Sequence, residues 1–434
     1  MSERKGSRVP GFHLLPIEER QALIARLAGL DEAERTLLAS ERPLPIAAAA
    51  RLTENTVGVY ALPMGIALNF VVNGDEVLVP MVTEEPSVIA AASNAARLAR
   101  PAGGFVAEAD PPCMIAQVQL VDLPDAHAAR DLLEAAAAGI AARVDELVPG
   151  MVRRGGGARG TEVRVLQAPD GRPFVVVHLL VDVGDAMGAN AINTIAEQTA
   201  PLLEEISGGT AHLRILSNLA DRRRGRASVR YRFADLAMAD RPGEDVARGV
   251  ELASFFAEAD PYRATTHNKG IMNGIDAVAL ATGNDWRALE AGAHAYAARD
   301  GHYGALSTWR VDGTELVGRI ELPLAVGTVG ATVEGNPRAR LALKLLGARS
   351  ANRLIEILAA VGLAQNFAAV RALATEGIQR GHMAQHARAV AAAAGARPEE
   401  VEAVATALIA GGEIKVERAR RLLADGLPTA GRRR

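Results

Sequence analysis

The chain has 434 residues, of which 49% are hydrophobic, 23% are charged and 3% are aromatic. This length predicts two or three domains, and the scarcity of aromatic residues predicts cores built from Ala, Leu, Val and Ile. The formal net charge is −3 and the basic residues are spread along the chain, which argues against a nucleic-acid partner because such surfaces usually carry a basic stripe. We interpret the arginine runs 222–224 and 432–434 as solvated clusters.

The single cysteine, Cys113, excludes an internal disulfide and is typical of a reducing compartment. No apolar stretch follows the charged N-terminal residues as it would in a signal peptide. No uncharged apolar run reaches the ~18 residues of a membrane-spanning helix. We therefore expect a cytoplasmic protein without a membrane partner.

The first 110 residues are predicted to form short helices followed by a strand hairpin. Apolar positions recur at helical spacing over 17–40, which predicts two helices. Residues 66–80 alternate as strands around Asn73-Gly74-Asp75, a typical hairpin turn. Pro86 is then expected in the first turn of an alanine-rich helix that reaches Leu98, because proline is well tolerated there.

Residues 111–218 are predicted to form a separate α+β domain. The expected elements are a strand at 114–121, a long helix at 125–148 with Leu132, Leu133, Ile140 and Val144 on one face, strands at 161–167 and 173–183, a helix at 190–206 and a strand at 212–216. The order βαββαβ is that of the ferredoxin-like fold. A glycine-rich loop, 153–157, falls between the first helix and the two middle strands.

The remaining sequence returns to mixed strands and long helices. Helices are expected near 243–258, 285–299 and 350–375, and three more at 377–394, 398–409 and 416–423, separated by glycines. We therefore predict an α+β protein. Its large mixed α/β domain is formed by 1–110 and 219–376, with the ferredoxin-like domain 111–218 inserted into it and a helical domain, 377–434, at the C-terminus.

Two polar segments lie at predicted strand–helix junctions. Glu84 and Glu85 precede a helix, where carboxylates can act chemically or simply favour the helix dipole. The segment Asp185–Asn190 contains glycines that let a ligand approach the backbone, and the helix that follows offers N–H groups to a phosphate. It lacks the Gly-x-Gly-x-x-Gly fingerprint, so a standard Rossmann site is not predicted.

Two further segments carry residues suited to catalysis. Lys269 lies among small and apolar residues, with Asp285 sixteen positions later. This pair could be a structural ion pair, or the lysine could stabilise a developing oxyanion. His382 and His386 share a helix face and could bind zinc, but the sequence lacks His-Glu-x-x-His. A general acid or a structural histidine is favoured, and no metal site is expected.

Five motifs together resemble class II 3-hydroxy-3-methylglutaryl-CoA (HMG-CoA) reductase, in family order over nearly the whole chain. They are Glu54–Gly58, Glu84–Ser87, Asp185–Asn190, Asn268–Gly274 and Gly381–Met383. The first is the family's dimer motif, with Val57 where isoleucine is usual. The resemblance implies a homodimer with its active site at the interface, and it makes the ferredoxin-like domain the cofactor domain.

The resemblance also implies the residues of the site. The catalytic residues would be Glu85, Lys269, Asp285 and His382. The substrate would contact Ser87, Arg263 and Asn273. The dinucleotide would contact Asp185, Ala186, Met187, Gly188, Ala189 and Asn190.

These residue types suit two successive hydride transfers that interconvert HMG-CoA with mevalonate and CoA. Lys269 would donate to the carbonyl oxygen as it becomes an oxyanion, and Asp285 would hold the lysine. His382 would protonate the departing CoA thiolate. Glu85, in its acid form, would protonate the aldehyde oxygen in the second transfer. Arg263 would bind the substrate carboxylate through its planar fork.

The cofactor preference rests on residues at the end of the helix predicted at 125–148. Asp145 or Glu146 could accept from the ribose 2′-hydroxyl of NADH, whereas Arg153 and Arg154 would favour the 2′-phosphate of NADPH. The resemblance to bacterial relatives favours NADH.

Three alternative functions remain open from the sequence. The first is another CoA-linked, nicotinamide-dependent oxidoreductase on the same scaffold. The second is a non-enzymatic protein that binds a dinucleotide or CoA. The third is a zinc hydrolase that uses His382 and His386.

Overall fold

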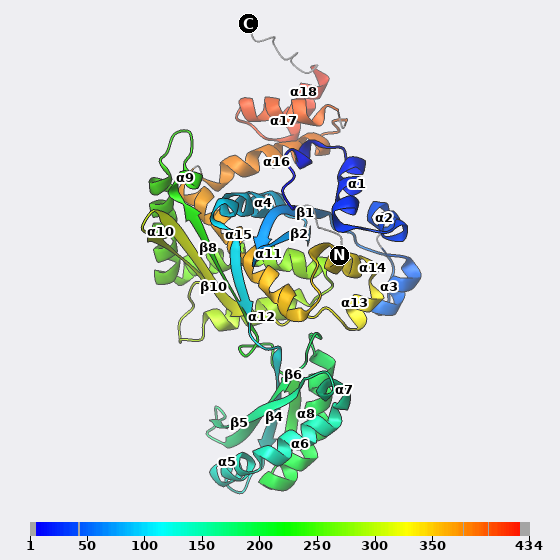
Figure 1. The fold of residues 1–434 in the computed structure, drawn as a ribbon, viewed down its shortest axis with the longest axis vertical. Helices are drawn as coiled ribbons and strands as arrows, with labels where there is room; N and C mark the ends of the chain where they lie inside the picture. The colour runs from blue at the N-terminus through cyan, green and yellow to red at the C-terminus, as the bar shows by residue number, and fades with distance from the viewer. Residues whose placement is uncertain (1–5, 42–43, 376, 398, 426–434) are drawn as a thin grey trace.

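The computed structural model describes residues 6–41, 44–375, 377–397 and 399–425, and within these ranges it describes no side chain between 378 and 385. A large mixed body of sheet and helices occupies the centre of the molecule (Figure 1). A four-stranded unit, called the lower unit below, lies under the central body and is joined to it by two chain segments (Figure 1). The C-terminal helices lie above the central body (Figure 1).

The central body is built on a six-stranded sheet in the order β2-β1-β3-β8-β10-β9. Its strands are β1 (Met64–Val72), β2 (Asp75–Val82), β3 (Phe105–Ala109), β8 (Arg224–Arg232), β9 (Ser307–Asp312) and β10 (Glu315–Pro323). β3 pairs antiparallel with β8. Because β3 precedes the four-stranded unit in the chain and β8 follows it, this pairing joins the two halves of the central body into one sheet.

Helices from both halves of the chain pack in one core with this sheet. They are α4 (Val88–Ala99), α10 (Gly243–Ala259), α11 (Pro261–Ala281), α12 (Trp286–Ala297) and α15 (Ala351–Ala374). Among the described residues, α15 is the one helix long and apolar enough to cross a membrane, but 67% of its most apolar window is buried inside the protein. It is therefore a core helix.

Shorter elements complete the central body. They are η1 (Phe12–Leu14), α1 (Ile17–Ala28), α2 (Glu32–Ala39), α3 (Ile46–Leu52), η2 (Arg100–Ala102), α9 (Phe233–Leu236), α13 (Ala331–Gly335) and α14 (Pro337–Leu346). The two helices predicted over 17–40 are present as α1 and α2, and they share a small core with α14. The predicted hairpin is also present, with Asn73 and Gly74 at φ of 54° and 83° between paired residues Val72 and Asp75.

The helix expected to open at Pro86 begins two residues later, so that prediction was wrong. Ser87 has φ +73°, a left-handed conformation that cannot belong to an α-helix. Helix α4 therefore starts at Val88, and Glu85 and Pro86 stay in the loop after β2.

The lower unit contains β4 (Cys113–Val121), β5 (Gly157–Gln167), β6 (Pro173–Asp182) and β7 (Thr210–Leu216) in the sheet order β5-β6-β4-β7. Its helices are α5 (Ala126–Ala135), α6 (Ala137–Leu147), α7 (Pro149–Val152) and α8 (Ala189–Ser207). The unit has a hydrophobic core of its own. This is the predicted βαββαβ arrangement, with the sheet order of the ferredoxin-like fold.

The single long helix predicted over 125–148 is divided in the structure. Ala136, at φ −85° and ψ 3°, leaves helical geometry and separates α5 from α6. Leu133, Ile140 and Val144 are buried as expected, but Leu132 is 54% exposed. Adjacent residues point about 100° apart on a helix, and with Leu133 facing the core Leu132 points sideways into solvent.

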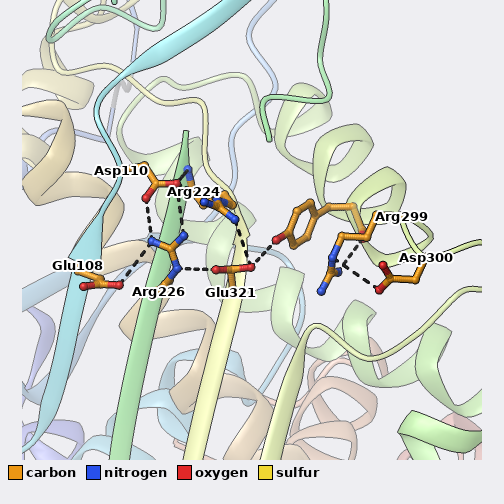
Figure 2. A network of polar contacts seen from close by, with 8 residues as sticks. Glu108, Asp110, Arg224, Arg226, Arg299, Asp300 and Glu321 are labelled. Carbon is orange, nitrogen blue, oxygen red and sulfur yellow. Dashed lines mark hydrogen bonds and ion pairs between the residues drawn. The ribbon is translucent and has the colours of Figure 1, made fainter. Parts of the chain in front are cut away.

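The two chain segments that join the central body to the lower unit lie side by side. The backbone N–H of Asp110 donates to the carbonyl of Arg224, and the Asp110 carboxylate accepts from Arg224 Nε at 2.8 Å and from Arg226 Nη1 at 2.7 Å. Arg226 also pairs with Glu321 of β10 (Figure 2). These ion pairs fasten the point where the chain leaves and re-enters the central sheet.

The interpretation of 222–224 as a solvated arginine cluster was wrong for its middle member. Arg223 is 0% exposed, because the returning chain turns its side chain inward between the two bodies. Arg222 stays on the surface with an ion pair to Glu162.

The C-terminal helices are α16 (Ile378–Ala393), α17 (Val401–Ala410) and α18 (Val416–Ala424), close to the three predicted segments. Residues such as Val390, Val404 and Leu408 form a separate small core among them. These helices therefore pack on one another around a core distinct from that of the central sheet.

Candidate active site

Glu85 and Lys269, 184 residues apart in the chain, form an ion pair between the loop after β2 and the middle of α11. Lys269 Nζ lies 2.8 Å from Glu85 Oε2, and Asn273 Nδ2 donates to Glu85 Oε1 at 3.2 Å. Asn273 follows Lys269 by one helical turn, so both side chains leave α11 on the same face. Together they hold both oxygens of one carboxylate.

This cluster lines a pocket of about 430 Å³ between α4, α11 and α15. Five of the predicted catalytic or substrate-binding residues contribute to its wall: Glu85, Ser87, Arg263, Lys269 and Asn273. The side chains of Lys269 and Glu85 are 58% and 35% exposed, so their ion pair faces solvent. The pocket thus presents cations and amide groups that suit an acidic substrate with a carbonyl.

Arg263 lies nearly three turns before Asn273 on the same helix and is partly buried. Burial lowers its pKa from the usual value, although a guanidinium stays charged near neutral pH. Its backbone N–H donates to the Asp260 carboxylate at 2.9 Å, which caps α11. A planar cation held in a partly desolvated wall is well suited to bind a carboxylate through two hydrogen bonds.

The whole of α11 was absent from the sequence-based prediction, although it carries Arg263, Lys269 and Asn273. Polar residues interrupt its apolar pattern because they line the pocket. Asp260 followed by Pro261 is a helix-start signal that could have identified it.

Asp285 occupies the N-cap of α12. Its carboxylate accepts from the backbone N–H groups of Arg287 and Ala288 and pairs with the Arg287 side chain at 3.3 Å. In this structure Glu85, rather than Asp285, is the carboxylate paired with Lys269. The expected Asp285–Lys269 contact is therefore not the one formed here, and a role of Asp285 in catalysis stays a prediction.

A pair of partly buried carboxyl groups, Asp276 and Glu290, lies near Lys269 and was not foreseen. Burial raises the pKa of Asp276, on α11, to about 8, and a hydrogen bond with Glu290 adds to this rise. The pKa of Glu290 is lowered, chiefly by its bond to His294 at 2.7 Å and partly by the charge of Lys269. One proton is thus held between the two carboxyl groups near neutral pH, and Glu290 keeps the negative charge that attracts Lys269.

The segment Asp185–Asn190 forms a turn that leads into α8, at the boundary between the lower unit and the central body. The Asp185 carboxylate accepts from the N–H of Ala351 at 2.8 Å, at the start of α15. The carbonyl of Asp185 accepts from the N–H of Thr328 at 2.9 Å. The turn predicted to hold a dinucleotide is therefore hydrogen-bonded to the central body at Thr328 and Ala351.

The loop 326–330 connects this turn to the neighbourhood of Asp285, and sequence reasoning missed it. Asn284 exchanges two hydrogen bonds with the backbone of Gly327, at 2.8 and 3.1 Å. A Cβ on Gly327 would lie 2.4 Å from the backbone nitrogen of Met187, so only glycine lets the loop approach the turn this closely. The sequence Gly327-Thr328-Val329-Gly330, which follows β10 after three apolar residues, was the available signal.

His382 falls within α16, but its side chain lies outside the described residues. Gly377, which immediately precedes α16, belongs to the pocket wall. His386 is described and exposed on the same helix.

Comparison with known proteins gives one consistent result. The family model for hydroxymethylglutaryl-coenzyme A reductase matches residues 16–387. The chain is 48% identical over 418 residues to 3-hydroxy-3-methylglutaryl-coenzyme A reductase of Archaeoglobus fulgidus, covering 96% of this chain and 94% of that protein. It is 36% identical to a probable enzyme of the same name from Borreliella burgdorferi, over 77% of this chain and 76% of that protein.

Solved structures agree. The fold superposes on the Streptococcus pneumoniae reductase with a TM-score of 0.82 and 43% identity, covering 96% of this chain and 99% of that one. A class II Streptococcus pneumoniae reductase bound to NADPH in open conformations gives a TM-score of 0.81 and 44% identity, over 84% and 99% of the two chains.

Proposed function

The chain belongs to the hydroxymethylglutaryl-coenzyme A reductase family, and on that premise we propose which of its residues perform each step of the reaction. The protein is an oxidoreductase of that activity. In the reductive direction, HMG-CoA, two reduced nicotinamide cofactors and two protons give mevalonate, two oxidised cofactors and free CoA. The observation that supports our assignment most directly is that Glu85, Lys269 and Asn273 converge in one pocket with Arg263.

Lys269 is proposed to stabilise the oxygen that becomes negative when the first hydride reaches the thioester carbonyl. Its ammonium group is exposed to the pocket and held 2.8 Å from Glu85. Collapse of that intermediate leaves an aldehyde and releases the CoA thiolate, which His382 would protonate. The second hydride then converts the aldehyde to an alkoxide. Glu85 would enter this step in its acid form, give the alkoxide a proton and become the carboxylate that accepts from Lys269 and Asn273. Arg263 and Ser87 would hold the substrate carboxylate and hydroxyl.

Asp285 is proposed to act at the side of the pocket that faces the cofactor. Its neighbour Asn284 binds Gly327, and Gly327 packs on Met187 of the dinucleotide turn. The nicotinamide would therefore arrive next to Asp285 when the turn is occupied, and a shift of this N-cap carboxylate toward Lys269 would follow cofactor binding. The cofactor would supply the hydride, while the residues of the chain would orient the cofactor and transfer the protons.

CoA is proposed to enter through a second pocket, of about 820 Å³, on the other side of the loop that carries Glu85. The two pockets share Glu85 and Ser87. Arg8, Arg20 and Arg97 line the larger one, and three arginines beside an apolar wall suit the phosphates and the pantetheine arm of CoA.

The dinucleotide is proposed to bind on the turn Asp185–Asn190, with its diphosphate at the N-terminus of α8. We propose NADH as the preferred form. Asp145 lies beside the glycine-rich loop, where its Oδ1 accepts from the N–H of Ala158 at 2.7 Å. This hydrogen bond fixes the Asp145 carboxylate, and we propose that it accepts from the ribose 2′-hydroxyl of NADH, whereas Arg153 and Arg154 are exposed.

Oxidation of mevalonate in the presence of CoA is expected to reduce NAD with a kcat/KM at least tenfold higher than NADP. Asp145→Asn keeps an acceptor for Ala158 but removes the charge, and we expect it to reduce that preference several-fold. Glu146→Gln is the matched control, because Glu146 is exposed and pairs with Arg143. A tenfold preference for NADP would show that the arginines dominate, and no turnover with either nucleotide would refute the proposed function.

The protein is proposed to be a cytoplasmic homodimer whose active site is completed across the interface. Residues around the dimer motif expose apolar side chains: Val57 is 101% exposed, Tyr60 91% and Leu52 49%. A run of exposed apolar residues of this kind marks a protein interface more often than bare surface.

Val57→Asp is expected to convert the dimer to a monomer and to lower activity at least tenfold. Light scattering coupled to gel filtration measures the mass, and activity is assayed on the same fractions. Leu132→Asp is the control, since Leu132 is also exposed but lies on α5 of the lower unit. A fully active monomer would contradict the composite site.

A further inference from the structure

Arg223 is a buried cation at the boundary between the lower unit and the central body. It is 0% exposed, whereas its neighbour Arg222 is on the surface. Its guanidinium group donates to three backbone carbonyls from two segments: Ala186 at 3.1 Å, Met187 at 3.4 Å and Val326 at 2.5 Å. The first two belong to the proposed dinucleotide turn and the third to the loop that packs on it.

The charge of Arg223 is retained despite its burial. Burial lowers the pKa of Arg223 to about 10, still well above neutral pH, and the nearby carboxylates of Asp182 and Asp185 favour the charged form. Its Nε has no hydrogen-bond partner among the described residues. A buried charge with an incomplete set of partners is costly to maintain, so a structural contact alone would be served better by an apolar residue.

The contacts of Arg223 orient the peptides of the turn. In a trans peptide the carbonyl and the following N–H point in opposite directions. Because the carbonyls of Ala186 and Met187 point to Arg223, the amides that follow them point away from it. The first hydrogen bond within α8 is that from Ile192 N–H to the carbonyl of Gly188. The amides of 189–191 therefore have no partner within the helix, and a diphosphate is the kind of ligand they fit.

We infer that Arg223 is a positioning residue for the dinucleotide: it holds the turn 186–187 against the loop at Val326 and so fixes the entry to α8, whose amides 189–191 would meet the diphosphate. This inference rests on the proposed function, in which the turn is the cofactor site. It predicts an effect on cofactor binding that is separate from HMG-CoA binding, because the contacts of Arg223 are to the turn and its supporting loop.

The test compares Arg223→Met, Arg223→Lys and the control Arg222→Met in the full chain. Binding of NADH and NADPH is measured by fluorescence titration, and KM is measured separately for cofactor and HMG-CoA. Arg223→Met is expected to raise Kd and KM for the cofactor tenfold or more while KM for HMG-CoA changes less than twofold. Arg222→Met should change each value less than twofold.

If Arg223→Met does not fold, the Arg223→Lys variant tests whether Arg223 positions the dinucleotide turn. One ammonium group cannot reach the turn and Val326 together, so the lysine variant is expected to raise the cofactor Kd three- to tenfold. An unchanged Kd in a folded Arg223→Lys or Arg223→Met protein, or equal rises in KM for both substrates, would overturn the inference.

Asn190→Asp separates this inference from the proposed function. The substitution adds a carboxylate in the first turn of α8, where it is compatible with the helix but repels a diphosphate. If Asn190→Asp weakens cofactor binding and the Arg223 variants do not, only the inference on Arg223 fails. If neither weakens it, the turn is not the dinucleotide site.

Discussion

Lys269→Ala is expected to lower kcat by about 10²–10³-fold, the usual cost of removing one donor to a developing oxyanion. The hydride transfer creates a negative oxygen in the pocket, and the Lys269 ammonium is the cation placed beside Glu85 to receive it. The fold should be unaffected. The Lys269–Glu85 pair is largely exposed, and exposed pairs contribute about 0–1 kcal/mol to the free energy of unfolding.

The measurement is steady-state kinetics together with a thermal melt of each variant. Lys344→Ala is the matched control, because Lys344 also forms an exposed ion pair with a glutamate, Glu34, but lies outside the pocket. It should keep wild-type kcat. Activity of Lys269→Ala within a few-fold of wild type would refute the assignment of Lys269 as the oxyanion donor.

His382→Gln is expected to slow reduction of HMG-CoA by about 10²–10⁴-fold, the range typical of a lost general acid. Reduction of free mevaldehyde should fall only a few-fold, because that half-reaction has no thiolate to protonate. Both substrates are assayed with the same enzyme preparation. The control is His386→Gln, one turn further along α16, which should affect neither reaction.

Equal losses in the two reactions would show that His382 does not serve the thiolate. The proposal also requires α16 to approach the pocket when substrate and cofactor are bound, as a lid that closes over the reaction. Crystals with and without both ligands should place α16 differently. One unchanged position would argue against a flap.

The elements that local patterns specify were predicted well. Asn73-Gly74 defined the hairpin because its left-handed conformations suit a two-residue turn, whatever the rest of the chain does. The βαββαβ order was readable because each strand and helix of the lower unit shows its own periodicity. The predictions failed where the local sequence was compatible with more than one backbone conformation. Ser87 adopts a left-handed conformation and moves the start of α4 to Val88, and Ala136 divides a helix that was expected to be continuous.

The sequence by itself determined the family, the order of the elements and the residue types of the site, because these depend on near neighbours and on ordered motifs. Only the tertiary structure decided which groups meet. Glu85 pairs with Lys269 across 184 positions, and Asn284 reaches the dinucleotide turn through Gly327. Arg223 is buried although its neighbour Arg222 is solvated. Such contacts depend on how distant segments pack. The residues that surround Arg223 or pair with Glu85 lie far from them in the sequence, so local spacing does not predict these contacts.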